Sequence, residues 1–328
     1  MSSDIAVVVE HLEGVLAEVS FEMLAKGREL AAAGGGMLWA VLIGHGVAKL
    51  AGELGAADGV AVVEHEALAH YTPEAYEKAA AAALQALGPR VALVASSSMG
   101  LDQAAGLSGT LGWPLCAYCK DVALTDGALT DGALTAVSQI YGGKLLATAE
   151  VPGDHAICAM LPGAAAAAAG RKSGAPSVRE ISPPALDGLR MRFKRLIQPE
   201  GGDVDITREG ILVSVGRGIG SQDNIAVVKE LAEALGGAVS SSRPIVDQGW
   251  LPKTRQVGKS GLSVKPKLYL AVGISGAPEH IEGMRGAELI VAINTDPGAP
   301  IFDVAHYGVV SDLFDVIPAL TEKVKSQA

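Results

Sequence analysis

The chain has 328 residues and a formal net charge of −10 at pH 7, and 49% of its residues are hydrophobic while only 4% are aromatic. This length suggests about two domains, and a core rich in aliphatic residues is typical of parallel sheets covered by helices. The acidic balance excludes nucleic acid as a main partner, and the absence of an apolar run of ~18 residues excludes a membrane-spanning segment.

Residues 5–160 alternate short apolar runs with helical patterns, which predicts βαβ crossovers and a mostly parallel sheet. We expect strands at 5–10, 37–43, 59–64, 90–95, 114–119 and 155–160, and helices at 21–33, 48–54, 73–87 and 101–112. No basic region precedes the first strand, so a signal peptide is not expected. Three cysteines are too few for a disulfide framework, which favours a reducing, cytoplasmic compartment.

Two groups of residues in this half have both a functional and a structural interpretation. Ser96-Ser-Ser-Met-Gly100 follows a predicted strand and could bind an anion, but a plain helix N-cap is the preferred interpretation. Cys116 and Cys119 form a Cys-x-x-Cys pair. On a strand, a spacing of three places them on opposite faces, which favours core cysteines over a metal or redox site.

Two further patterns are interpreted as surface features. His65 and His70 are one residue too far apart for the helical zinc-protease motif. The sequence Leu124-Thr-Asp-Gly-Ala is repeated at once from Leu129, and Asp-Gly is a tight-turn dipeptide, so we expect local turns there. No metal site is predicted.

Composition changes between Pro162 and Leu189, where an alanine run is followed by Gly-rich and Pro-rich sequence. Such composition without an apolar period is typical of a linker. We therefore expect an N-terminal α/β domain at 1–162, a linker at 163–190 and a C-terminal domain at 191–328.

The C-terminal domain repeats the strand–turn–helix pattern. Its predicted strands end near Gly216, Ser240, Gly273 and Asn294, and helices are predicted at 224–235 and from Asp312 onward. The glycines at 216–220 do not match the nicotinamide-binding fingerprint, because the last glycine and the ribose-binding acid are missing.

Polar or small residues follow four of these strands: Arg217, Ser242-Arg243, Ser275-Gly276 and Asn294. In an open α/β sheet, ligands bind at the carboxyl ends of the strands. Gly and Ser let a phosphate approach backbone N–H groups, and a helix that begins near Ala277 favours negative charge at its start. The pattern predicts a pyrophosphate-binding site.

Eight motifs in the last third carry a more specific signal: Gly216-Arg-Gly, Ser242-Arg-Pro-Ile-Val-Asp247, Gln256-Val-Gly-Lys-Ser-Gly261, Leu268-Tyr-Leu-Ala-Val-Gly-Ile-Ser-Gly-Ala277, Glu279-His280, Val291-Ala-Ile-Asn-Thr-Asp296, Ala299-Pro-Ile-Phe302 and Tyr307-Gly to Asp312-Leu-Phe314. Through them, residues 207–320 closely resemble the α subunit of electron transfer flavoprotein. The N-terminal half resembles this family more loosely, through its α/β pattern and Tyr141-Gly-Gly143.

The resemblance implies a Rossmann-like C-terminal domain that binds FAD. Matched to the family's motifs, the residues on the phosphate side are Arg217 and Ser242, and the residue against the isoalloxazine ring is Arg243. The flavin edge would be lined by Val257, Gly258, Lys259 and Ser260, with the Ser260 hydroxyl near N5. The stretch from the pyrophosphate to flavin O2 would be Ser275, Gly276, Ala277, Pro278, Glu279 and His280, and the ribityl-adenosine portion would be held by Asn294, Asp312 and Leu313. The family commonly has Gln and Thr where this chain has Lys259 and Ser260, and Ile-Gln where it has Pro278-Glu279.

A carrier of single electrons must stabilise the negative charge that the flavin gains with each electron. A fixed cation beside the ring does so, and arginine suits this role because it never deprotonates. We expect Arg243 to supply that cation and His280 to contact O2.

The resemblance further implies a heterodimer in which the N-terminal domain packs against a β subunit. The complex would carry electrons from flavin dehydrogenases, such as the acyl-CoA dehydrogenases of fatty acid β-oxidation, to an acceptor such as a quinone oxidoreductase. A carrier of this kind is not an enzyme in the strict sense. Participation in flavin-based electron bifurcation stays open.

Two alternatives come from other functional classes. Gly273-Ile-Ser-Gly-Ala277 resembles a nucleophile elbow, which would suit a nucleotide-dependent hydrolase or transferase using Ser275, although His280 follows too soon and His306 is the only later histidine. A nucleotide-sensing module would bind adenine nucleotide without flavin. Arg217 could be a plain surface charge, and Asp312 could serve only the start of the last helix.

Overall fold

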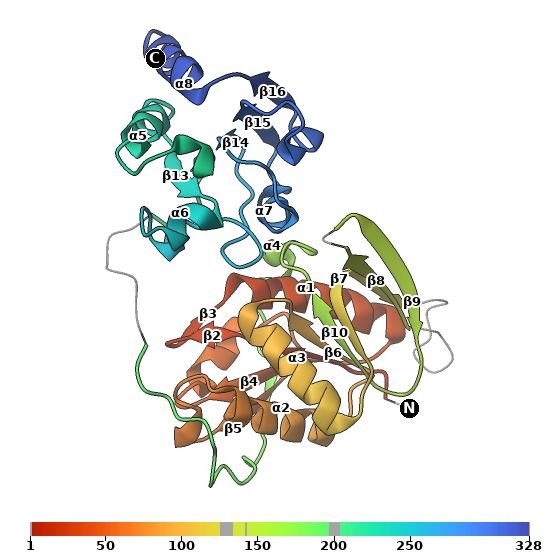
Figure 1. Cartoon of the computed structure of the whole chain (residues 1–328). Coiled ribbons are helices and arrows are strands. Elements are labelled where there is room, and N and C mark those ends of the chain that lie inside the picture. The colour runs from red at the N-terminus through yellow and green to blue at the C-terminus, as the bar shows by residue number, and fades with distance from the viewer. Residues whose placement is uncertain (1, 125–133, 142, 197–203, 328) are drawn as a thin grey trace. The chain divides into compact units, whose positions relative to one another are not determined.

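The computed structural model describes residues 2–124, 134–141, 143–196 and 204–327 (Figure 1). The chain divides into two compact units, Met1–Arg195 and Leu196–Ala328, and each is described by itself. The predicted turn repeat lies outside the described residues from residue 125 onward. Within the described ranges, no helix is both long enough and apolar enough to cross a membrane.

The first unit, in its described part, is built on a nine-stranded sheet with the order β11-β5-β4-β1-β6-β10-β7-β8-β9. The strands from β11 to β7 are parallel, and β8 is antiparallel to both of its neighbours, β7 and β9. Their bounds are β1 Ile5–Val8, β4 Leu38–Gly44, β5 Gly59–Glu64, β6 Val91–Ala95, β7 Leu115–Leu124, β8 Leu134–Ile140, β9 Leu145–Val151, β10 Ala156–Met160 and β11 Ser177–Glu180. The predicted α/β class with a mostly parallel sheet is confirmed.

Helices cover both faces of this sheet. Helix α1 (Glu18–Gly34), with the short α4 (Ala167–Gly170) packed on it, lies on one face, and α2 (Pro73–Leu87) and α3 (Ser98–Leu111) lie on the other. The helix predicted at 48–54 is a 3₁₀ helix, η1 (Ala48–Glu53). Shorter elements are the hairpin β2 His11–Leu12 with β3 Val15–Leu16, and η2 Glu66–Leu68.

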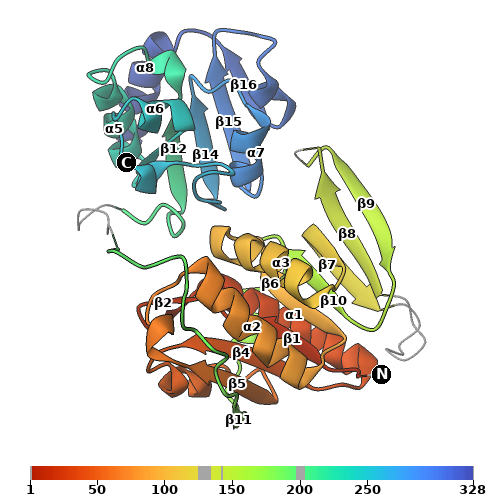
Figure 2. The ribbon, with the colours of Figure 1, turned by 60° about the horizontal axis from the view of Figure 1, so that its bottom comes forward.

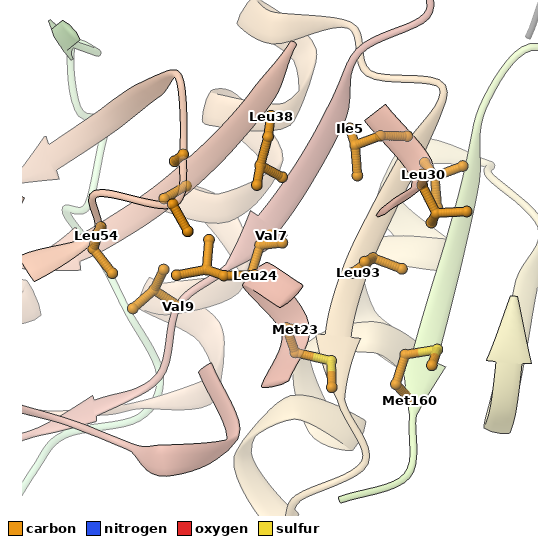
Figure 3. Close-up of a cluster of buried hydrophobic side chains, with 14 of the residues drawn as sticks. Ile5, Val7, Val9, Met23, Leu24, Leu30, Leu38, Leu54, Leu93 and Met160 are labelled. Carbon is orange, nitrogen blue, oxygen red and sulfur yellow. The ribbon is translucent and has the colours of Figure 1, made fainter. Parts of the chain in front are cut away.

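Side chains alternate along β1 between two hydrophobic clusters. Ile5 and Val7 pack with α1 in one cluster, which Figure 3 shows, while Ala6 and Val8 pack with α2 and α3 in the other. Because the strand is buried on both faces, it appears in the sequence as a continuous apolar run.

Two parts of the first unit depart from the simple βαβ pattern. The hairpin of β8 and β9 was not expected, because half-exposed Thr, Ser and Gln interrupt its apolar pattern. The segment 163–190, expected as a linker, contains α4 and β11. Strand β11 pairs with β5 at the sheet edge, and all four of its residues are exposed, so no buried periodicity marked it as a strand.

A β-bulge changes the interpretation of the Cys-x-x-Cys pair. Tyr118 has a φ of 55°, and β7 uses one more residue between Cys116 and Cys119 than β10 uses between Cys158 and Met160. The expectation that the two cysteines lie on opposite faces was therefore wrong, since Cys116, Cys119 and Cys158 all pack with the same hydrophobic cluster. All three are free thiols in or against the core.

The Ser96–Gly100 segment forms the predicted N-cap. The Gly100 N–H donates to Ser97 Oγ over 2.9 Å at the start of α3. The Ser97 hydroxyl in turn donates to Glu10 Oε1 over 2.6 Å, and burial raises the pKa of this carboxyl. A buried carboxyl therefore lies where an anion would have to bind, which agrees with the capping interpretation.

The second unit, as far as the structure describes it, has a five-stranded parallel sheet with the order β13-β12-β14-β15-β16. The strands are β12 Ile211–Val215, β13 Ala238–Ser241, β14 Leu268–Val272, β15 Leu289–Asn294 and β16 Tyr307–Val310. Helices α5 (Ile225–Ala234) and α8 (Leu313–Lys325) lie side by side on one face, and α7 (Pro278–Met284) packs on the other (Figure 2). Remaining elements are α6 Arg243–Asp247, η4 Arg217–Ile219, η5 Lys253–Arg255 and η6 Pro300–Asp303.

This strand order creates a switch point between β12 and β14. Strand β12 connects through α5 to β13 on one side, whereas β14 connects through α7 to β15 on the other side. The two connections leave the sheet in opposite directions, so a crevice forms beyond the carboxyl ends of these neighbouring strands.

Candidate functional site

A cavity of about 860 Å³ opens at the carboxyl ends of the strands in the second unit. Cofactor pockets commonly enclose about 300–1,000 Å³, so its size suits a ligand as large as a dinucleotide. It is lined by Arg217, Gly218, Ser242, Arg243, Pro244, Gln256, Val257, Gly258, Lys259, Ser260, Gly273, Ile274, Ser275, Ala277, Glu279, His280 and Asn294.

Most of the residues predicted from the sequence line this cavity, and four do not: Gly276, Pro278, Asp312 and Leu313. Asp312 caps α8, where its Oδ1 accepts a hydrogen bond from Phe314 N over 2.9 Å. Leu313 is 6% exposed and packs in the core beneath the strand ends. Pro278 is the first residue of α7. The structural interpretation of Asp312 is thus confirmed, while any contact with a ligand remains a proposal.

The turn after β14 is held closely by its neighbours. Asn294 Nδ2 donates to the Ile274 carbonyl over 2.8 Å, and Ile301 N donates to the Ser275 carbonyl over 3.0 Å. Gly276 has a φ of 87°, and a Cβ there would lie 2.3 Å from Ile301 N. Only glycine fits this position, so the turn after β14 can pack closely against Ile301.

A second loop, residues 256–262, closes on itself at the edge of the cavity and is called the rim loop below. Leu262 N donates to the Gln256 carbonyl over 2.8 Å, and Gly258 N donates to the Leu262 carbonyl over 3.1 Å. Gln256 is 4% exposed, and its side-chain Nε2 donates to Ser260 Oγ over 2.8 Å. The loop therefore presents Ser260 to the cavity from a hydrogen-bonded backbone rather than from a free surface segment.

Positive charge is concentrated in this cavity although the chain as a whole is acidic. Arg217, Arg243 and Lys259 line it against a single carboxylate, Glu279. Arg243 also pairs with Asp247, with 3.3 Å between Nε and Oδ2. Small and apolar residues occupy much of the remaining wall. This combination of cationic, small and apolar residues favours a negatively charged ligand with a large planar ring.

His280 lies at the inner wall and is 6% exposed. Its Nδ1 is 3.1 Å from the Val257 carbonyl, and its Nε2 is 2.9 Å from Tyr269 Oη. A carbonyl only accepts, so Nδ1 carries the proton and Nε2 accepts from the tyrosine. Burial lowers the His280 pKa to about 4, so the imidazole is neutral at pH 7.

We expect the buried imidazole to make stability depend on pH. Because its pKa lies below that of a free histidine, the unfolded chain binds this proton more readily, and stability is lost as pH falls from about 6.5 toward 4. At pH 4.5 the loss from this group alone should reach about 2–3 kcal/mol. Urea unfolding of wild type and His280→Gln at pH 7 and pH 4.5 measures it; an equal loss in both proteins would contradict the assignment.

The two hydrogen bonds of His280 argue against hydrolase chemistry at Ser275. Both ring nitrogens of His280 are engaged by Tyr269 and Val257, so this histidine is not placed as the base of a nucleophilic serine. His306 does not line the cavity, and its Nδ1 accepts from Ile290 N over 3.0 Å.

Comparisons with known proteins show the family of this chain. The family described as "Electron transfer flavoprotein FAD-binding domain" matches residues 205–285, and that described as "Electron transfer flavoprotein domain" matches residues 5–186. The chain belongs to the electron transfer flavoprotein α-subunit family. The predicted FAD cofactor and the family assignment from the motifs are thereby confirmed.

Similar proteins extend over nearly the whole chain. An electron transfer flavoprotein subunit alpha from Thermoanaerobacterium thermosaccharolyticum is 37% identical over 326 residues, covering 98% of both chains. Protein FixB of Azotobacter vinelandii is 36% identical, with 98% of this chain and 91% of the relative covered. The acryloyl-CoA reductase electron transfer subunit beta of Anaerotignum propionicum is 34% identical, with 98% and 95% covered.

The family's cofactor suits the cavity of this chain. Three cationic side chains and the glycines Gly218, Gly258 and Gly273 line the cavity, and Val257 and Ser260 add an apolar side chain and a hydroxyl to its wall. Sequence reasoning missed five lining residues, namely Gly218, Pro244, Gln256, Gly273 and Ile274. All five lie inside or beside motifs that were noticed, but only the fold shows which members of a motif face the cavity.

Proposed function

We propose that this chain is an electron carrier that holds FAD in the cavity of its second unit and works as the α subunit of a heterodimer. The observation that supports this most is the cationic cavity of about 860 Å³ at the switch point of the second sheet. The bound FAD would take up and release the electrons at its isoalloxazine ring. The chain itself would bind, orient and electrostatically tune that ring.

Arg217, Ser242 and the turn at Ser275 are our candidates for the phosphate side of the cofactor. They follow β12, β13 and β14, and Gly216 N and Gly218 N donate to the Val272 and Gly273 carbonyls, which locks the ends of β12 and β14 together. Asn294 would act mainly by holding the β14 turn, because its amide already donates to Ile274.

Arg243 and the loop from Val257 to Ser260 are our candidates for the flavin ring. The guanidinium would stabilise negative charge on the reduced ring. The neutral imidazole of His280 would hold the inner wall of the cavity in place. A contact from His280 to flavin O2 would require it to give up one of its present bonds, to Val257 or to Tyr269.

The partner we propose is the β subunit of an electron transfer flavoprotein, packed in part on the first unit. A cavity in that unit, lined among others by His70, Leu186 and Phe193, has a volume of about 420 Å³, about half that of the cavity in the second unit. Flavin dehydrogenases such as acyl-CoA dehydrogenases would supply electrons and an oxidoreductase would accept them. Three free thiols fit a reducing, cytoplasmic compartment.

We expect the chain expressed without its partner to be poorly stable or to lose FAD, because a subunit of an obligate complex exposes apolar surface when alone. Size-exclusion chromatography with flavin absorbance, compared between the chain alone and the co-expressed pair, measures this. A stable, flavin-loaded monomer would contradict it. A colourless pair would contradict the proposed function itself.

Counting flavins in the purified pair also tests for electron bifurcation. One FAD per pair fits a simple carrier, whereas two FAD molecules would place the second flavin in the partner and favour a bifurcating complex.

A further inference from the structure

Gln256 is a buried polar residue whose side chain faces a residue of the proposed flavin site. It is 4% exposed, and its backbone lies between β13 and the rim loop: Val257 N donates to the Ser241 carbonyl over 2.9 Å. A Cβ on Gly261 would come within 2.3 Å of the Gln256 carbonyl, so the loop folds tightly around this residue. The position of the Gln256 side chain is therefore constrained by both its own backbone and the loop that it supports.

The hydrogen bond from Gln256 determines where the Ser260 hydroxyl can send its proton. The amide Nε2 donates to Ser260 Oγ over 2.8 Å. A serine hydroxyl has one proton, and an amide NH₂ group cannot accept it. The proton must therefore point elsewhere, and Ser260 lines the cavity.

We propose that Gln256 is a positioning residue that makes Ser260 a hydrogen-bond donor to the flavin. The inference rests on the proposed function, because it takes the cavity as the flavin site. Oxidised flavin has acceptor atoms along its ring edge, and negative charge accumulates on them on reduction. A donor preset toward this edge favours the reduced ring, whereas a hydroxyl free to rotate would satisfy other partners part of the time.

Replacement by glutamate would reverse the bond. In Gln256→Glu the carboxylate only accepts, so the Ser260 proton would turn toward residue 256 and its oxygen lone pairs would face the cavity. In Gln256→Met the donor is lost at similar side-chain length, and the hydroxyl is left free. The two variants therefore separate reversal of the bond from its loss.

The experiment uses the chain co-purified with its β partner, stripped of flavin and titrated with FAD. We expect the FAD dissociation constant to rise about 2- to 10-fold in Gln256→Met, as for loss of one hydrogen bond, and further in Gln256→Glu. The midpoint potential of the bound flavin should fall in both. Gln248→Glu makes the same chemical change on an exposed residue that does not line the cavity, and we expect it to alter neither quantity.

A double-mutant cycle with Ser260→Ala separates positioning from simple support of the loop. If Gln256 acts through the hydroxyl, Gln256→Met will change neither affinity nor potential in the Ser260→Ala background. An undiminished effect there would overturn the inference while leaving the flavin site intact. A wild-type pair that binds no FAD would instead overturn the proposed function.

Discussion

Replacing Arg243 by alanine is expected to lower the midpoint potential of the bound flavin by on the order of 100 mV and to weaken FAD binding. A cation about 4 Å from the ring contributes up to about 4 kcal/mol at an effective dielectric constant of about 20. Arg243 is exposed and paired with Asp247, and both conditions reduce its electrostatic contribution below this upper value. For one electron, about 1.4 kcal/mol corresponds to about 59 mV. Spectroelectrochemical titration of the flavin measures the shift.

The chain offers a matched control for this experiment. Arg208 also forms a short-range ion pair on the surface of the second unit, 3.2 Å from Asp205, but it does not line the cavity. Arg208→Ala removes the same charge and should leave the potential unchanged. Arg243→Lys keeps the charge and should retain most of the potential. If Arg243→Ala has wild-type potential and FAD content, the role assigned to Arg243 is wrong.

Gly276→Ala is expected to destabilise the second unit by about 3–4 kcal/mol. The new methyl group would lie 2.3 Å from Ile301 N, and the residue would have to keep a φ of 87°. To remove this clash, the turn after β14 must move away from η6, and this movement would also displace Ser275. The free energy of urea unfolding and the FAD content should therefore fall together.

Gly249→Ala serves as the control for backbone conformation. Gly249 has a φ of 72°, and a Cβ there would meet no atom within 4 Å, so this change should cost only about 1 kcal/mol. If the two variants were equally stable, the close approach of the β14 turn to Ile301 would not be a real constraint.

The strands that position the site were predictable because their signals are local. The apolar run Leu268–Val272 is followed directly by small residues, and β14 has those same bounds. Arg217, Ser242 and Asn294 were identified because parallel strands place their carboxyl ends at one edge, so residues distant in sequence meet there.

Other features depend on neighbours that the sequence does not place. The bulge at Tyr118 turns Cys119 to the face of Cys116, and it depends on how β7 pairs with β10. Strand β11 is marked only by its pairing with β5, because its side chains are exposed. His280 is neutral because it is buried, and its tautomer is set by the Val257 carbonyl and the Tyr269 hydroxyl, which no spacing rule brings together.

The sequence alone determined the α/β class, the flavoprotein family and most of the residues around the cavity, because apolar periodicity, strand-end chemistry and specific motifs are all written along the chain. Only the tertiary structure decided which polar atoms face one another. The direction of the Gln256–Ser260 bond and the tautomer of His280 follow from hydrogen-bond partners that the fold positions, whereas the cap at Asp312 is local and was within reach of the sequence.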